Sequence, residues 1–349
     1  MTDYLSVISA DGKQYTRGTG KSVFIGCLGV CLGFTEPTIF REKYSDITRT
    51  LFGAIISKTG KEVLKSHDIN ESNWKNRSQF LTLLQAFTSE VISLGVVINV
   101  VFTTFNPQKL PEGVSIFGAG RTPEEKIDVP SFLEMLHQYY PYIAAWKVSK
   151  TAQLRSCEVY LDNFSSTYVS PAWEELCAHH TVKIYPHGDA CNKFISTADI
   201  ITRYIDEYLY AYKLHLTEES ISAALQVCNS TDHHIFYTGH PDLLNIVPIS
   251  KERIDFRDFS PSPALYLIRD MGFKNELSFI ENSPSWTRLL NLAESLNGCV
   301  KYLDLQNDSK NIKPGDKLVY YSEDGKQVAE SLKNMGYDVE ILEFSKIRS

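Results

Sequence analysis

The sequence predicts an α/β protein in which helices flank a mixed sheet and a second, smaller α/β domain follows. Three observations support this prediction. Two strand-like segments at the start enclose a polar turn that contains glycines, as in an antiparallel hairpin. Amphipathic helical segments then alternate with short apolar strands. The end of the chain has a strand, a helix and a strand in close succession, which implies a right-handed crossover between parallel strands.

Size and composition fit a folded protein of two domains. The chain has 349 residues, of which 43% are hydrophobic and 22% are charged. Its 35 Lys and Arg residues against 42 Asp and Glu residues give a net charge of -7, which excludes a generally basic nucleic-acid-binding chain. The charge is uneven, because residues 1–215 carry -1 and residues 216–349 carry -6. If a polyanion binds, the first part is therefore the expected place.

The seven cysteines and the first residues of the chain indicate in which cellular compartment the protein is expected. The number of cysteines is odd and they form no dense framework. The polar segment Met1–Lys13 lacks the features of a signal peptide, and the apolar stretch Val23–Phe34 is too short to span a bilayer. We expect a soluble protein of a reducing, cytoplasmic compartment, with no membrane partner.

The first expected domain covers residues 1–215. We expect strands at Asp3–Ala10 and Ser22–Phe34, joined by a turn at Asp11–Lys21. Spacing of apolar residues predicts helices at Thr38–Phe52, at Asn76–Leu94, from Ser131 toward Trp146, at Ala172–His179 and at Thr197–Leu216. Further strands are expected at Val96–Phe102, Glu158–Leu161 and Val182–Tyr185, with a loop at Pro107–Pro130.

The second expected domain covers residues 216–349. It has shorter elements, with helices predicted at Glu218–Val227 and Trp286–Leu296, and extended segments at Ile235–Tyr237, Ile246–Pro248 and Val300–Leu305. The closing unit is predicted as strand Lys317–Tyr321, helix Gly325–Met335 and strand Val339–Phe344, with Gly336 where a helix C-cap belongs.

Two motifs suggest ligand sites, but each has a simpler explanation. Arg17–Ser22 ends like a nucleotide-binding loop, yet such a loop must open a helix and the residues after Ser22 favour a strand. We therefore favour a hairpin turn. A possible zinc cluster consists of Cys177, His179, His180, His187, Asp189 and Cys191. Its spacing fits no common zinc finger, so buried cysteines and surface histidines are favoured.

Two groups of aromatic residues have open assignments. Tyr139, Tyr140, Tyr142 and Trp146 stand beside Lys147 and Lys150, as in a stacking surface for a single strand. We favour instead a core position for Tyr140 and Trp146 and a surface position for the others. Tyr204, Tyr208, Tyr210 and Tyr212 lie on the last helix of the first domain. Their spacing wraps around that helix, so we expect a seam with the second domain or a partner.

Carboxylates at element ends are the strongest candidates for chemistry. Asp11 follows the first expected strand, Asp162 follows Glu158–Leu161, and Asp199 lies in the first turn of the last helix. Glu62 or Asp68 lies between the first helix and the next strand. Carboxylates that converge cannot all be ionised without cations. Two divalent ions about 4 Å apart would relieve the repulsion and promote phosphodiester cleavage.

These residues resemble the motifs of an RNase H-like family of unknown function that opens with a D-E-S-G motif and closes with an A-D helix. The matching segments are Ser9–Gly12, Glu62–Ser66, Tyr160–Asp162 and Ile195–Asp199, so the resemblance covers roughly residues 1–215. It implies an RNase H-like sheet and a metal-dependent nuclease that acts on DNA or RNA.

The resemblance also implies roles for single residues. Asp11 and Asp162 would bridge two Mg²⁺ or Mn²⁺ ions, while Glu62 (or Asp68) and Asp199 would each hold one ion. Lys65 or Lys193 would neutralise the scissile phosphate. The alternative is a non-catalytic adaptor of the same fold that binds nucleic acid or a protein partner. In either case the acidic second domain is a candidate protein-binding surface.

Overall fold

The structure is a computed structural model of the chain. It describes residues 6–19, 22–70, 74, 76–105, 129–151, 153–162, 170–238, 259–269, 276–303 and 309–348. The predicted loop at Pro107–Pro130 and the extended segment at Ile246–Pro248 lie almost wholly outside these residues. The described part contains one mixed and one parallel sheet with helices packed on both, so the prediction of a mixed α/β protein is confirmed.

The first sheet has the strand order β5-β4-β1-β2-β3-β6. Strands β1, β2 and β3 are antiparallel neighbours, β4 and β5 run parallel to β1, and β6 runs parallel to β3. The six strands are β1 (Val7–Thr19), β2 (Ser22–Phe34), β3 (Val97–Phe105), β4 (Glu158–Asp162), β5 (Thr181–Tyr185) and β6 (His233–Tyr237).

The predicted hairpin is present, but its first strand is longer than expected. Pairing between β1 and β2 continues from Val7 opposite Phe34 to Thr19 opposite Ser22. The polar segment that begins at Asp11 is therefore strand and not turn, because the ladder with β2 uses its backbone groups.

Ser22 begins a strand, so Arg17–Ser22 lacks the helix that a nucleotide-binding loop requires. Part of that segment, residues 20 and 21, lies outside the described residues.

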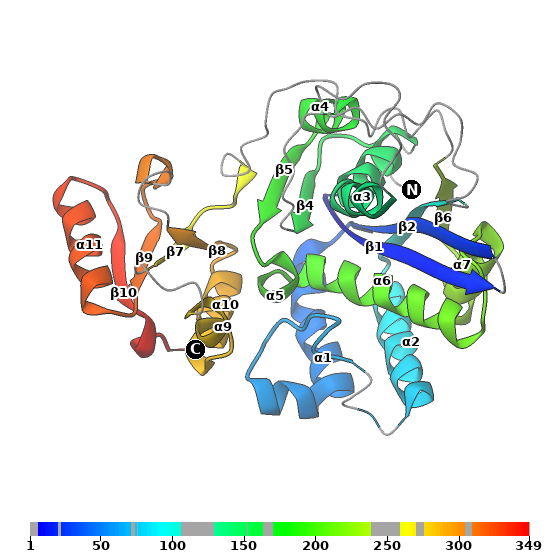
Figure 1. Cartoon of the computed structure of the whole chain (residues 1–349), viewed down its shortest axis with the longest axis horizontal. Coiled ribbons are helices and arrows are strands. Elements are labelled where there is room, and N and C mark those ends of the chain that lie inside the picture. Colours follow the sequence, from blue (N-terminus) through cyan, green and yellow to red (C-terminus); the bar gives the residue numbers. More distant parts are fainter. Residues whose placement is uncertain are drawn as a thin grey trace.

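Helices cover both faces of the first sheet (Figure 1). Helices α3 (Val129–Thr151) and α4 (Pro171–His179) pack on one face. The opposite face carries α6 (Lys193–Ala211), with α1 (Pro37–Thr59) and α2 (Arg77–Ser93) packed against it. Gly29 lets α3 approach, since a Cβ there would lie 3.2 Å from the Cβ of Ala144.

The aromatic cluster on α3 belongs to the core. Tyr139, Tyr140, Tyr142 and Trp146 are each at most 4% exposed. The core role expected for Tyr140 and Trp146 is therefore correct, whereas Tyr139 and Tyr142 are buried and not on the surface as expected. The stacking surface for a single strand is not available at these rings. On α6 the tyrosines divide, because Tyr204 is buried whereas Tyr210 and Tyr212 are 49% and 60% exposed.

The first sheet extends beyond the boundary expected at residue 215. After α6 the chain forms α7 (Glu218–Val227) and then β6, which pairs with β3 from Ile98 opposite His233 to Phe102 opposite Tyr237. The hydroxyl of Tyr204 on α6 donates to the carbonyl of Ala224 on α7 (2.8 Å). Strand pairing thus places residues 218–237 with the first sheet.

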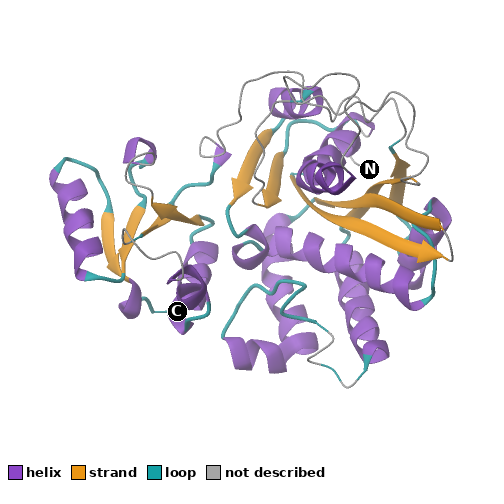
Figure 2. Cartoon of the chain, in the orientation of Figure 1, coloured by secondary structure: helices purple, strands orange, loops and turns teal. Residues whose placement is uncertain are grey.

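The second sheet is parallel, with the order β10-β9-β7-β8 (Figure 2). Its elements are β7 (Ala264–Ile268), α9 (Glu276–Glu281), α10 (Pro284–Ser295), β8 (Cys299–Leu303), β9 (Lys317–Tyr320), α11 (Glu323–Asn334) and β10 (Glu340–Glu343), with 3₁₀ turns at Ser309–Asn311 and Phe344–Lys346. The predicted closing strand–helix–strand unit is confirmed, and Gly336 has the positive φ (98°) expected after a helix. Among the described helices, none combines the length and apolar character needed to cross a bilayer.

Candidate carboxylate site

Asp11 and Asp162 come together because their strands are parallel neighbours. The β1–β4 register pairs Ala10 with Leu161, so Asp11 and Asp162 are the next residues on adjacent strands. Side chains alternate along a strand, and the Ser9 hydroxyl donates to the Phe194 carbonyl of α6 (2.9 Å). Asp11 therefore lies on the same face as Ser9, the face that α6 covers.

A backbone amide fixes the carboxylate of Asp162. Its Oδ1 accepts a hydrogen bond from the amide of Gly188 (2.7 Å), which begins the one-turn helix α5 (Gly188–Cys191). A Cβ at residue 188 would lie 2.6 Å from the Cδ1 of Ile195 and 3.1 Å from this same Oδ1. Only glycine allows the backbone to approach the carboxylate so closely.

Asp199 is held by the loop between α1 and α2. Its Oδ2 accepts from the Ser66 amide (2.6 Å), and its Oδ1 accepts from the Ser66 hydroxyl (2.7 Å). The loop is itself anchored to α6, because the hydroxyl of Ser196 donates to the carbonyl of Leu64 (2.6 Å) and Tyr44 bonds both segments. Both oxygens of Asp199 thus have fixed partners.

The same loop supplies Lys65, and the one-turn helix α5 supplies a fourth aspartate, Asp189. The Nζ of Lys65 lies 2.9 Å from the Oδ1 of Asp189 on α5. Asp68 shapes the loop, because it accepts from the Lys65 amide (3.0 Å) and forms an ion pair with Lys61 (2.6 Å). We call Asp11, Asp162, Asp189, Asp199 and Lys65 the carboxylate site.

Burial and neighbouring carboxylates raise the pKa of two of the aspartates, Asp11 and Asp199. Burial raises the pKa of Asp11, and the carboxylates of Asp199, Asp162 and Asp189 raise it further. Burial also raises the pKa of Asp199, although the hydrogen bonds from Ser66 oppose this. Like charges that are crowded in a low-dielectric place disfavour ionisation. The site therefore has an excess of negative charge.

Lys65 carries the matching positive charge. Burial alone would lower its pKa, but the carboxylates of Asp189, Asp162 and Asp199 outweigh burial, and the net pKa is raised. The positive charge of Lys65 also contributes, after burial, to lowering the pKa of His187. An ammonium group within reach of three aspartates partly offsets their repulsion.

The donor set suits a hard divalent cation. Carboxylate oxygens are the ligands that Mg²⁺ and Mn²⁺ prefer, and mutual repulsion among aspartates is relieved by a cation. As arranged here, no three His, Cys, Asp or Glu side chains of the described residues stand at metal-binding geometry. The chemistry of the residues thus fits the expected metal, while the metal itself stays a prediction.

Comparison with known proteins places the site within a family. Residues 8–257 match the family model described as "Domain of unknown function (DUF8203)". The chain belongs to this family. All residues of the carboxylate site lie inside the matched region, and α10 lies outside it. A relative from Archaeoglobus fulgidus, described as "Uncharacterized protein", is 29% identical over 329 residues, which cover 93% of this chain and 94% of the relative.

Two predicted site residues, Glu62 and Lys193, make their described contacts with α10 and not within the carboxylate site. Glu62 is exposed, and its amide donates to the side-chain oxygen of Asn291 on α10 (3.2 Å). Lys193 forms an ion pair with Glu294 of α10 (3.3 Å), in which both side chains are nearly buried. The charges that raise the pKa of Asp11 most are those of Asp199 and Asp162. The roles of Glu62 and Lys193 at the metal and the phosphate stay predictions.

Members of the suspected zinc cluster have other partners. His180 contacts the Ser149 hydroxyl and the Cys157 thiol (3.2 Å), and the ring of His187 packs edge-on against Trp286 at 5.2 Å. Asp189 belongs to the carboxylate site instead. The sequence motifs indicate Asp189 only as a zinc candidate and assign no role to Ser66. The useful signal was the position of Asp189 just after a strand that neighbours β4.

Helix α10 supports the site from the second sheet (Figure 1). The side chain of Asn291 accepts from the Glu62 amide and donates to the carbonyl of Gly60 (2.9 Å), so it spans the start of the Lys65 loop. The Lys193–Glu294 ion pair ties α10 to the first residue of α6. One helix thereby holds two of the elements that carry site residues, the Lys65 loop and α6.

Proposed function

We propose that the protein is a metal-dependent nuclease that cleaves phosphodiester bonds of DNA or RNA at the carboxylate site. The observation that carries this proposal is the convergence of Asp11, Asp162 and Asp199 from β1, β4 and α6 on one face of the first sheet. These are three of the four acids that the RNase H-like resemblance assigns to metal binding.

The topology also supports this proposal. A long antiparallel hairpin stands at the centre of the first sheet, and the strands that follow on one side run parallel to β1. This is a mixed sheet flanked by helices of the kind that the resemblance implies. The fold alone does not define an activity, so the argument for cleavage depends on the acids.

Each residue of the site has a task in the proposed reaction. The Gly188 amide and Ser66 orient the carboxylates of Asp162 and Asp199, and Asp11 approaches them from the next strand. When bound, Mg²⁺ or Mn²⁺ supplies positive charge that activates a water and stabilises the phosphodiester transition state. Lys65 is placed to bind a substrate phosphate, because its ammonium can exchange the carboxylate of Asp189 for another anion.

We further propose that Asp189 takes the place that sequence reasoning gave to Glu62. The carboxylate of Asp189 is close enough to raise the pKa of both Asp11 and Asp199. It also pairs with Lys65 in this structure. The fourth acid would then come from α5 and not from the loop after α1.

A cleavage assay with a matched pair of variants tests this function. Labelled single-stranded and duplex DNA and RNA are incubated with Mn²⁺ or Mg²⁺ and the wild-type protein, Asp162→Asn or Asp46→Asn. Asp46 is an exposed aspartate on α1 and serves as the control. Asparagine at residue 162 keeps the oxygen that accepts from Gly188 but removes the charge.

We expect the wild type and Asp46→Asn to cleave at the same rate and Asp162→Asn to be inactive, with no cleavage by any variant in EDTA. Equal cleavage by Asp162→Asn and the wild type would overturn the proposal. Wild-type protein that binds nucleic acid but cleaves nothing with either metal would also overturn it and would favour the adaptor.

A further inference from the structure

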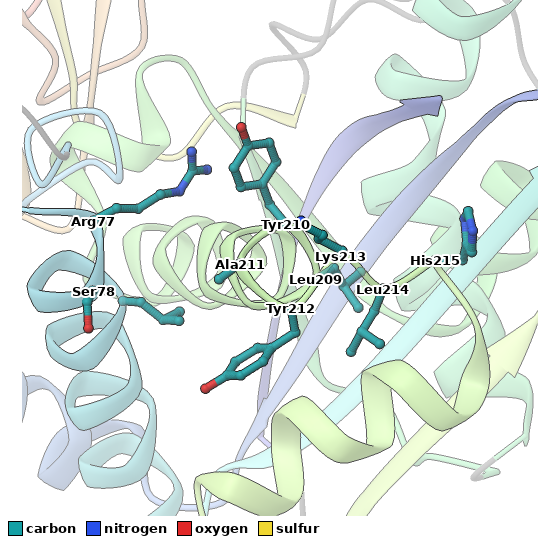
Figure 3. Close-up of a pocket in the computed structure, with 10 residues that line it drawn as sticks. Arg77, Ser78, Leu209, Tyr210, Ala211, Tyr212, Lys213, Leu214 and His215 are labelled. Atoms are coloured by element: carbon teal, nitrogen blue, oxygen red, sulfur yellow. The ribbon is translucent and has the colours of Figure 1, made fainter. Parts of the chain in front are cut away.

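A pocket at the far end of α6 is lined by aromatic, basic and apolar residues. It has a volume of about 670 Å³ and lies where the end of α6 meets the start of α2. This volume is within the usual range for small-ligand pockets. The lining of this pocket includes Arg77, Tyr210, Tyr212, Lys213 and His215 (Figure 3). We call this the tyrosine pocket.

Two exposed aromatic rings stand at this pocket. Tyr210 and Tyr212 are 49% and 60% exposed, although large aromatic side chains in a folded domain are normally covered. The guanidinium of Arg77 lies 3.5 Å from the ring centroid of Tyr210, and the ring of Tyr212 packs against Tyr208 at 4.6 Å. Both rings are thus held in place and still present surface to solvent, as stacking platforms for bases do.

The charges at the tyrosine pocket favour an anion. Its described lining residues include Arg77, Lys213 and His215 but no Asp or Glu. Behind it, the buried carboxylate of Glu207 is shared by Arg77 and Arg203, each with an Nη2 at 2.5 Å. Two guanidinium groups and one carboxylate leave a net positive charge beside an apolar surface. A nucleobase with its phosphate matches this combination.

Helix geometry connects the tyrosine pocket with the carboxylate site. Tyr210 follows Asp199 by eleven residues, which is three turns, so the two side chains lie on the same side of α6. The rise along the helix is about 16 Å. Asp206 lies between them on that side, and Lys13 of β1 neutralises it at 2.9 Å. A strand that is cleaved at the aspartates can therefore extend along α6 to the tyrosines.

From these observations we infer that the tyrosine pocket binds a base and phosphate of a single-stranded nucleic acid whose remote part occupies the carboxylate site. The placement of the rest of the strand in the carboxylate site rests on the proposed function. Binding of a base and phosphate at the tyrosine pocket does not depend on that function. A free mononucleotide offers the same chemistry, so the experiment includes both ligands.

Binding is measured by fluorescence anisotropy of a labelled 20-mer oligothymidylate in EDTA, where no cleavage occurs. Tyr210→Leu and Lys213→Gln remove the ring and the charge, and Tyr210→Phe keeps the ring. Phe279→Leu removes an 80% exposed aromatic residue of α9 and is the matched control. Arg77 is left unchanged, because its loss would remove one of the two ion pairs of the buried Glu207. Thermal melting verifies that each variant is folded.

We expect Tyr210→Leu to weaken binding about tenfold, because stacking on one aromatic ring is worth that much. Tyr210→Phe and Phe279→Leu should bind like the wild type, and Lys213→Gln should weaken binding and flatten its salt dependence. The inference fails if Tyr210→Leu binds as well as the wild type, or if the wild type binds thymidine monophosphate but not the 20-mer. Because the assay needs no cleavage, a negative nuclease assay leaves its result valid.

Discussion

Ser66 donates two hydrogen bonds to the carboxylate of Asp199, one from its amide (2.6 Å) and one from its hydroxyl (2.7 Å). The two residues come from different parts of the chain, a loop after α1 and the long helix α6. One carboxylate is thus oriented by a segment that also carries Lys65. The orientation of the acid and the position of the ammonium therefore depend on the same loop.

Removal of the Ser66 hydroxyl should impair the site without unfolding it. We expect Ser66→Ala to lower the rate of Mn²⁺-dependent cleavage roughly 10- to 100-fold, which is typical when a residue that orients a metal ligand is lost. Ser66→Thr keeps a hydroxyl and should recover most of the activity. Ser295→Ala, which removes an exposed hydroxyl on α10, is the control. A Ser66→Ala rate equal to that of the wild type would contradict the role of this bond.

The crowded aspartates predict a pH-dependent stability of the metal-free protein. Burial and then the neighbouring carboxylates raise the pKa of Asp11 above its unfolded value of about 3.9. The native state then binds the proton more tightly than the unfolded state. The stability contributed by this group is complete below the unfolded pKa and is lost as the pH rises through the folded pKa, at about 1.4 kcal/mol for each unit of difference.

Asp11→Asn should therefore melt at a higher temperature than the wild type at pH 7 in EDTA, and the difference should shrink toward pH 4. Added Mn²⁺ should raise the wild-type melting temperature more than that of the variant, because a ligand stabilises the state that binds it. Scanning calorimetry at both pH values measures each effect. A variant that is less stable than the wild type at pH 7 in EDTA would show that the charge at residue 11 is not repelled.

Asp189 and Glu62 can be distinguished directly. If Asp189 is the fourth acid, Asp189→Asn should weaken Mn²⁺ binding and slow cleavage, whereas Glu62→Gln should change neither. The amide of Glu62, which the substitution preserves, makes its contact with Asn291. Isothermal titration with Mn²⁺ and the cleavage assay provide the two readouts. The reverse pattern would return the role to Glu62.

The side chain of Asn291 should contribute measurably to stability. It is 8% exposed and bonds both the Gly60 carbonyl and the Glu62 amide. Asn291→Ala leaves these groups without that partner, at a cost of about 1–3 kcal/mol. Denaturant unfolding measures the change, and Asn334→Ala at the exposed end of α11 is the control. Unchanged unfolding of Asn291→Ala would mean that water replaces both bonds.

The sequence predicted most elements because their patterns are local. Apolar spacing located α2 and α6 within a few residues, and the apolar run in β3 marked a strand covered on both faces. The end of β1 was misplaced, since the polar residues after Asp11 are strand only through their pairing with β2. The structure brings Asp11, Asp162 and Asp199 close together, while their role at a metal stays a prediction.

What local patterns could not supply was the partner of each side chain. Asp189 lies shortly after β5 and Asp162 is the last residue of β4, but the cysteines and histidines near Asp189 suggested zinc. The Lys65–Asp189 pair joins residues more than a hundred positions apart. Nothing in the spacing of either segment indicates that pairing, because it arises only when the loop after α1 packs against α6.

The contact between Gly60 and Asn291 spans 231 residues of sequence. During synthesis, all four aspartates and the loop that holds Asp199 leave the ribosome well before α10 does. A nascent chain that ends before residue 284 would already contain the complete set of acids, yet the start of the Lys65 loop would lack the side chain that bonds it. The order of translation thus separates the appearance of the acidic residues from the final fixing of the loop that orients them.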